Sequence, residues 1–384
     1  MTGGPPADRA PTAPTDLSRP AESRPHPTPP EPRLALGGRS GPGALAPVAG
    51  AADDLRRPAW LERVPTNIDG QPTHRLIFIF RAPGCTYARR PAGGCTMCGF
   101  TPLTGRARTI TPADLIAQFD HVFGANAKGA SPPTPPLPTD LLTDLGEVDL
   151  YNSGSFLADE EMPPPVRAHI FRRLAGRGLR RVVVESRPEF VTPVALREAA
   201  ALPPGVLDVG IGLESADDHI REVLIRKGFD RPAFERAAGV LAETGLGLLV
   251  NILLKPPGVL DDRAALADAL ATGQYVAALA RRLRLRARLA LQPVFVAPGT
   301  ALEADFLAGR YQPPSLWTVV EAVRGLHGIL ETTVGLSDEG LEPHRSPAGC
   351  GRCDDALRAA LRDYNRTRCL AAFADLACSC RASP

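Results

Sequence analysis

The eight cysteines of this chain fall into two groups, and the first stands on a glycine-rich stretch, RAPGCTYARRPAGGCTMCGF. Its members are Cys85, Cys95 and Cys98, and the next cysteine is Cys350. Three thiolates can hold three irons of a 4Fe–4S cluster and leave the fourth iron open to an outside ligand. The neighbouring glycines let the backbone curl around a large cofactor and direct its amides at the cluster sulfurs. The stretch therefore predicts an iron–sulfur site.

A zinc site is the alternative for this stretch, with Cys95 and Cys98 as half of its ligands. Such a site needs a fourth ligand, and no other cysteine lies nearby in the sequence. The nearest histidine, His74, precedes an apolar run and is expected at the wrong end of the strand that the run forms. The pattern therefore favours the cluster.

The second group lies near the carboxyl end, where Cys350 and Cys353 form C-x2-C and Cys378 and Cys380 form C-x-C. Two short-spaced pairs are typical of a four-thiolate structural site, for which Zn²⁺ is our first choice. An auxiliary iron–sulfur cluster and thiols without metal are the alternatives. Cys369, between the pairs, is expected to be buried on a helix as a small apolar residue.

The overall composition indicates in which compartment, and with which partners, these sites operate. The 384 residues carry a formal net charge of +2, so bulk charge provides no drive toward nucleic acid or anionic lipid. No apolar run approaches the ~20 residues of a transmembrane helix, and the first residues lack the layout of a secretory signal. We therefore expect a cytoplasmic protein in a reducing compartment, without a membrane partner. There, clustered cysteines indicate metal binding more than disulfides.

Six apolar runs indicate strands buried on both faces of a parallel sheet. They span residues 75–80, 148–156, 181–186, 207–215, 247–255 and 288–296. The stretches between them are typical of helices: Thr111 and Pro112 predict a helix start, and the runs 164–178 and 231–245 end in glycine. Six βα units of an α/β protein fit a partial (β/α)6 barrel or a doubly wound sheet. Either architecture places ligands at the carboxyl ends of the strands, where the three-cysteine loop begins.

The composition and the pattern of apolar runs divide the chain into three regions. Residues 1–58 are rich in Pro, Ala and Gly and predict a disordered tail, and residues 131–140 predict a loop insertion. The αβ pattern occupies 59–340, and a short cysteine-rich motif occupies 341–384. We expect a metal to supply much of the folding free energy of this last region. The region itself is expected to seal the open end of the barrel or to bind the substrate.

The cysteine loop after the first strand resembles that of the radical S-adenosylmethionine (SAM) enzymes, and its C-x9-C-x2-C spacing is similar to that of the elongator-type branch. Together with YNSGSFL, ESRPEF, GIGLES, IRKGF and the cysteine-rich end, it resembles the archaeosine-synthesis radical SAM proteins from about residue 58 to 381. The resemblance implies a partial (β/α)6 TIM-type barrel in which a 4Fe–4S cluster on the loop binds and splits SAM.

The resemblance also implies SAM contacts at the ends of the strands. Ser153, Gly154 and Ser155 stand where the family's second strand binds the SAM amino group, although the usual motif there is Gly-Gly-Glu. Further candidates are Glu185 and Arg187 after the third strand and Glu214 after the fourth. Ion pairs among these residues at the barrel rim are the alternative. Arg221, Arg226 and Lys227 fit a solvated helix face as well as a SAM or phosphate clamp.

In the archaeosine family the substrate is a 7-deazaguanine in tRNA to which a partner enzyme has attached lysine. The radical enzyme, a lyase reduced by a flavodoxin- or ferredoxin-type donor, cleaves the lysine carbon–nitrogen bond. Basic stretches at 167–181 and 281–288 could follow a phosphate backbone, or could be ordinary arginine-rich helix faces. The alternatives are a radical SAM enzyme acting on a free nucleoside or another small precursor, and a non-catalytic iron–sulfur or zinc protein.

Overall fold

The computed structural model describes residues 1–4, 54–91, 93–100, 109–124, 140–336 and 345–382. Residues Leu36–Pro384 form one compact unit, and the four described residues of the other unit, Met1–Ala35, carry no helix or strand. The predicted tail and the predicted insertion lie almost wholly outside the described ranges. The domain boundaries at 58 and 340 therefore stay predictions.

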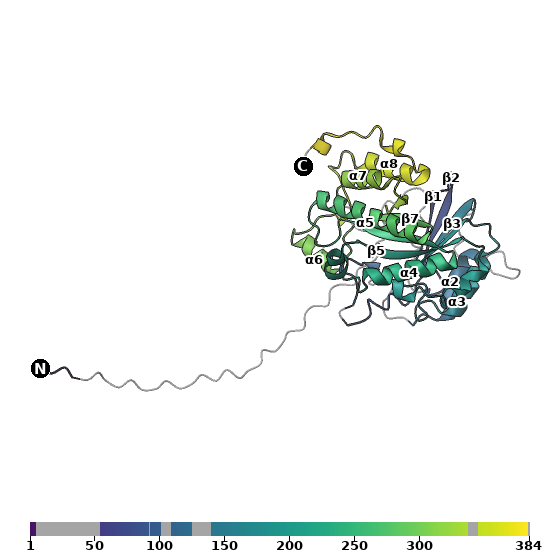
Figure 1. The fold of residues 1–384 in the computed structure, drawn as a ribbon, viewed down its shortest axis with the longest axis horizontal. Coiled ribbons are helices and arrows are strands. Elements are labelled where there is room, and N and C mark those ends of the chain that lie inside the picture. Colours follow the sequence, from purple (N-terminus) through teal and green to yellow (C-terminus); the bar gives the residue numbers. More distant parts are fainter. Residues whose placement is uncertain (5–53, 92, 101–108, 125–139, 337–344, 383–384) are drawn as a thin grey trace. The chain divides into compact units, whose positions relative to one another are not determined.

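The compact unit is built on one sheet whose eight strands follow one another in chain order, β1 to β8 (Figure 1). β1 runs antiparallel to β2, and every later pair is parallel. The strands are β1 (Trp60–Ile68), β2 (Gln71–Ile79), β3 (Leu145–Tyr151), β4 (Arg181–Glu185), β5 (Leu207–Glu214), β6 (Gly247–Leu254), β7 (Ala287–Pro293) and β8 (Glu331–Val334). The partial barrel expected from the sequence is confirmed, with each of the six predicted strands present as β2 to β7.

Two strands were not predicted, and both lie at the edges of the sheet. β1 carries Pro65 and mixes apolar with charged and polar residues, without a continuous apolar run, as an edge strand tolerates. β8 has only four residues, too few for a clear apolar run. The predicted strand 148–156 is also too long, because β3 ends at Tyr151 and the following residues turn.

Helices cover the outside of the sheet. They are α2 (Pro112–Phe123), α3 (Pro164–Leu174), α4 (Arg231–Thr244), α5 (Asp262–Leu283), α6 (Ala301–Leu307), α7 (Leu316–Leu326) and α8 (Asp354–Thr367). Thr111 caps α2, as predicted, and its side chain accepts a hydrogen bond from the N–H of Asp114. Gly245 ends α4 in the left-handed region, but α3 ends at Leu174 with Ala175 as its C-cap, before the glycine that was expected to stop it. None of the helices in the described ranges combines the length and the apolar character that a membrane crossing requires.

The amino-terminal end of the barrel interior is filled by buried ion pairs. Glu147 on β3 pairs with Arg181 on β4 at 3.5 Å and with Arg288 on β7 at 3.0 Å. Asp208 on β5 accepts from Arg288 at 2.9 Å, and Glu331 on β8 pairs with Arg181 at 3.0 Å. Two arginines of the predicted basic stretches thus serve inside the barrel, because strand alternation turns them inward. They are not available to a phosphate backbone.

The next residues inward along the same strands are mostly apolar. Val183, Leu249 and Ala290 form a small cluster inside the barrel, with Tyr151 packed against it. Two residues further toward the carboxyl ends, the inward positions become polar again, at Glu185, Asn251 and Gln292. The apolar layer therefore separates the ion pairs at one end of the barrel from a polar floor at the other, where the cysteine loop begins.

Candidate functional site

The three-cysteine loop follows β2 at the carboxyl end of the sheet, and each of its thiols is partly buried. Thr96, next to Cys95, fixes the loop to the segment that follows β5. Its N–H donates to the carbonyl of Ile225 at 2.9 Å, and its hydroxyl donates to the carbonyl of Leu224 at 2.7 Å. The loop is therefore held in place by backbone contacts on the far side of the barrel mouth.

A single buried carboxylate, Glu161, joins the cysteine loop to the turn after β3. Its oxygens accept from the N–H of Thr86 at 2.8 Å, the N–H of Ser155 at 2.5 Å and the side-chain amide of Asn152 at 3.1 Å. Burial raises the pKa of Glu161, and these hydrogen bonds oppose the rise. Glu161 thus orders two loops at once, one of which carries Cys85.

The turn itself is shaped to approach the cysteine loop closely. A Cβ on Gly154 would stand 2.9 Å from the Cα of Cys85 and would also collide with the Glu161 carboxylate. Ser153 has a φ of 58°, which is uncommon for a residue with a side chain. The Ser153 hydroxyl and the Asn152 side-chain oxygen are buried and lack a partner among the described residues. Unpaired buried polar atoms beside a cysteine are suited to a ligand with hydrogen-bonding groups.

The side chain of Arg187, which follows β4, is fully engaged in contacts with other residues of the protein. Its guanidinium lies 4.1 Å from the centre of the Tyr87 ring and donates to the carbonyl of Lys227 at 2.8 Å. It also donates to Glu189 at 2.7 Å, and its own backbone N–H donates to the Ser155 hydroxyl at 3.2 Å. Arg187 and Ser155 therefore connect the segments that follow β3, β4 and β5. Their predicted contacts with SAM stay predictions.

Glu214 ends β5 with a φ of 68° and pairs at 2.9 Å with Lys227, a residue outside the set in which rim ion pairs were expected. Burial lowers the pKa of Lys227, but the Glu214 carboxylate and the Cys95 thiolate together raise it above its ordinary value. Burial also raises the pKa of the Cys95 thiol, which the Lys227 charge opposes. Arg221 is buried and the Lys227 side chain is only 12% exposed, so neither belongs to a solvated helix face.

Glu185 faces the barrel interior at the end of β4. It accepts from the side-chain amide of Asn251 on β6 at 2.8 Å, and Asn251 in turn accepts from Gln292 on β7 at 3.4 Å. Burial raises the pKa of Glu185, and the nearby Glu214 adds to the rise. These groups form a polar floor beneath the cysteine loop, able to bind hydroxyl and amino groups of a ligand.

Three thiols on one loop are the type of donor that a 4Fe–4S cluster requires. Cys85, Cys95 and Cys98 are free thiols on one loop, and Gly154 lets the turn after β3 approach that loop where any larger residue would collide with it. Sequence reasoning missed Glu161, Asn251 and Tyr87. Asn251 could have been found, because it interrupts an apolar run with an amide. Glu161 gave no signal, because it lies in an ordinary acidic loop.

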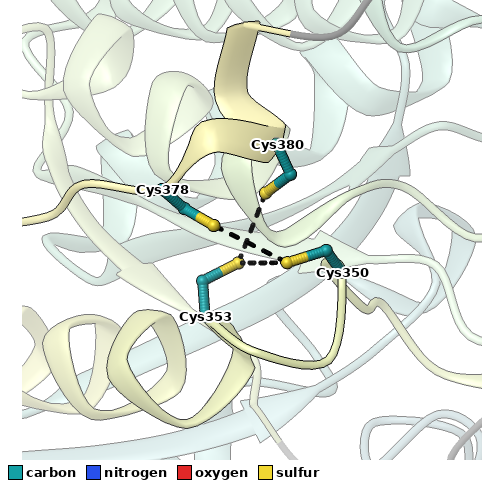
Figure 2. Close-up of side chains that lie close together, drawn as sticks. All are labelled: Cys350, Cys353, Cys378 and Cys380. Carbon is teal, nitrogen blue, oxygen red and sulfur yellow. Dashed lines mark hydrogen bonds between the residues drawn. The ribbon is translucent and has the colours of Figure 1, made fainter.

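The second cysteine group is assembled in the structure. Cys350, Cys353, Cys378 and Cys380 bring all four sulfurs within 4.8 Å of one another, and the group could hold a metal ion (Figure 2). A hydrogen bond from the backbone N–H of Arg352 lowers the pKa of Cys350 to about 6, which favours the thiolate. The prediction for Cys369 is wrong: this residue is exposed, because Arg368 ends α8 in the left-handed region and turns the chain outward.

No known family model matches the chain. Two proteins named archaeosine synthase subunit beta are similar to most of it. The protein of Methanosarcina acetivorans is 28% identical over 317 residues, which cover 82% of this chain and 85% of that protein. The protein of Thermococcus kodakarensis is 27% identical over 319 residues, which cover 82% and 92%. An uncharacterised protein of Methanocaldococcus jannaschii is 29% identical over 252 residues; these cover 65% of this chain and 63% of that protein, less than two thirds of its length.

Among solved structures, the chain is similar to Elp3 of Methanocaldococcus infernus, with 14% identity and a TM-score of 0.41. That likeness covers 60% of this chain and 57% of the other, and it is loose. The resemblance to the archaeosine-synthesis radical SAM proteins is confirmed by the two archaeosine synthase relatives.

Proposed function

We propose that this chain, a relative of the archaeosine synthase beta subunits, is a radical SAM enzyme with its reaction centre at the carboxyl ends of β2 to β6. One observation carries the proposal: the Cys95 thiol shares its surroundings with Lys227, Glu214, Arg187 and Cys85, which come from three separate strand ends. Residues far apart in sequence thus meet at the edge where parallel sheets bind ligands.

In this proposal Cys85, Cys95 and Cys98 hold a 4Fe–4S cluster. When bound, the cluster and SAM supply a one-electron cleavage that yields a hydrogen-abstracting radical. The chain's own residues position SAM and keep water out. The unpaired hydroxyl of Ser153 faces the ligand's polar groups, the Glu185 carboxylate accepts from a hydroxyl, and the Lys227–Glu214 pair provides both charges for an amino-acid head group.

We infer that the substrate is a lysine-modified 7-deazaguanine in tRNA and that the reaction is a carbon–nitrogen lyase step. The proposal is supported by the two archaeosine synthase relatives, which match the chain over 82% of its length. Their designation as beta subunits extends the proposal to a partner, the lysine-transferring enzyme. A flavodoxin- or ferredoxin-type protein would supply the electron.

A free nucleoside or another small precursor is the second candidate substrate. The placement of Arg181 and Arg288 favours it, because both are buried in ion pairs and so leave fewer arginines for a phosphate backbone. Binding of bulk tRNA, measured at several salt concentrations, separates the two. A tRNA-acting enzyme binds with an affinity that falls steeply with salt, and a nucleoside-acting enzyme shows no such binding.

The direct test is anaerobic reconstitution followed by mass spectrometry of tRNA nucleosides. Incubation with reduced protein, SAM and tRNA carrying the lysine adduct should convert the adduct to the amidine. Intact adduct, with a cluster present and SAM cleaved, would reject the tRNA substrate and leave the radical SAM assignment standing. A chain that binds iron but cannot cleave SAM would instead be a non-catalytic binding protein.

A further inference from the structure

The carboxyl-terminal cysteines form a site whose size can be compared with that of known metal centres. Cys350 and Cys353 lie on the turn before α8, and Cys378 and Cys380 lie at the end of the chain (Figure 2). Cys350 Sγ is 3.7 Å from the sulfur of Cys353 and 3.6 Å from that of Cys378. Cys353 Sγ is 3.6 Å from the sulfur of Cys380.

These separations match one tetrahedral ion. With Zn–S bonds of about 2.3 Å, the sulfurs of a tetrahedron lie ~3.8 Å apart. A polynuclear iron–sulfur cluster places irons and sulfides between its thiolates and spreads them wider than a single ion does. Among divalent ions that accept four thiolates in this geometry, Zn²⁺ binds more tightly than Fe²⁺.

The helix that begins at this site covers both edges of the sheet. Cys353 is the N-cap residue of α8, and α8 packs against β1 and β8. Asn365 on α8 accepts from the N–H of Val334 at 3.0 Å and donates to its carbonyl at 2.8 Å, as a neighbouring strand would. At the far end of α8, Arg368 reaches the hydroxyl of Thr66 on β1 at 3.4 Å. In the described chain β1 and β8 do not pair, so α8 connects the two edges.

The chain after α8 returns to the same site along α7. Phe373 stacks on Tyr364 of α8 with ring centres 5.5 Å apart, and its carbonyl accepts from Arg324 of α7 at 3.0 Å. Near the end, Arg381 lies 5.2 Å from the ring of Trp317 and pairs with Glu321 at 3.0 Å. Beyond Leu376 no large apolar side chain follows in the described chain, so a bond between Cys378 and Cys380 and the start of α8 would fix the end of this segment.

We propose that one Zn²⁺ ion, held by Cys350, Cys353, Cys378 and Cys380, fastens α8 across the two edge strands of the barrel. Binding displaces the thiol protons and involves no change of oxidation state. The ion closes a loop from the start of α8 to the end of the chain, and α8 in turn holds β1 and β8 in register. The site is independent of the proposed reaction and serves the fold.

The first test is metal analysis of the full chain with Cys85, Cys95 and Cys98 all replaced by Ala, which removes the other thiol site. One zinc per chain is expected, without acid-labile sulfide. Adding Cys378→Ser should release the zinc, whereas adding Cys369→Ser should retain it, because Cys369 is exposed and outside the group. Iron with sulfide, no metal, or equal zinc loss in both variants would overturn the proposal.

A second measurement does not depend on a variant that folds. Hydrogen exchange of the wild-type chain is compared before and after a mercurial reagent displaces the zinc. The amides of α8 and of Val334 should exchange at least 10-fold faster after displacement, while those of α4 should be unchanged. Unchanged exchange in α8 after complete zinc release would show that the ion does not hold the helix.

Discussion

Gly154 and Cys85 lie so close that a Cβ on the glycine would stand 2.9 Å from the Cα of the cysteine. The contact joins the turn after β3 to the loop that carries the three thiols. It explains why a glycine stands there, and it links cluster binding to the shape of a turn that supplies no thiol.

Gly154→Ala should therefore displace the cysteine loop. The methyl group forces the backbone or the buried Glu161 to move, and overpacking of this kind costs about 1–3 kcal/mol. Iron content after anaerobic reconstitution should fall well below the wild-type value. Gly176→Ala is the control, because nothing lies within 4 Å of its Cβ position. Wild-type iron content in the Gly154 variant would show that the contact is not needed.

Glu161→Gln should weaken the same region by a different route. The carboxylate accepts from the N–H groups of Thr86 and Ser155, and an amide nitrogen placed against either N–H would leave it without an acceptor. A lost charge-assisted hydrogen bond in a buried site costs about 1.5–3 kcal/mol. Denaturant unfolding measures this loss, with Glu160→Gln as the control, since Glu160 is exposed. Equal stability of the two variants would contradict the role of Glu161.

The pair of Glu214 and Lys227 should affect SAM binding and leave iron binding intact. Glu214→Gln removes the charge that holds Lys227 at 2.9 Å, and the freed ammonium can then approach Cys95. We expect the Kd for SAM, measured by equilibrium dialysis, to rise at least 10-fold, equivalent to about 1.4 kcal/mol, with iron content unchanged. Asp217→Asn, on the segment after β5, is a control for a carboxylate outside the pair. An unchanged Kd in the Glu214 variant would place SAM elsewhere.

Much of this arrangement could be predicted from the sequence, for physical reasons. Strands buried on both faces leave continuous apolar runs, so β2 to β7 were visible, and the short-range spacing of the cysteines indicated both thiol groups. The sequence could not indicate which polar residues are buried. Arg181 and Arg288 looked like a basic surface, because their partners Glu147 and Asp208 lie on other strands. The role of Glu161 depends on its hydrogen bond with Thr86, which is 75 residues away in the sequence and is brought close only by the fold.

The barrel interior also predicts a pH dependence of stability. Burial, and then the Glu147 charge, raise the pKa of Asp149 to about 7. In the folded state Asp149 therefore binds its proton more tightly than in the unfolded chain, where the pKa is about 3.9. The free energy of unfolding should fall as pH rises between about 4 and 7, by at most ~1.4 kcal/mol per pH unit from this group.

Asp149→Asn should remove that slope, because the amide does not titrate. Glu147 does not interfere, since its pKa is lowered to about 2 and it stays ionised throughout the window. Urea unfolding at pH 5, 6 and 7 measures the effect. The variant should be less stable relative to wild type at pH 5 than at pH 7. Parallel pH profiles for the two proteins would show that Asp149 is ionised in the folded state.

The central claim is that Cys85, Cys95 and Cys98 form a cluster site that cleaves SAM. Its most direct test is the release of 5′-deoxyadenosine from SAM by anaerobically reconstituted, dithionite-reduced protein. The wild-type chain should release it, the three single Cys→Ala variants should lose both iron and release, and Cys369→Ser should match the wild type. Release that persists in the alanine variants, or its absence from wild-type protein with a full cluster, would contradict the account.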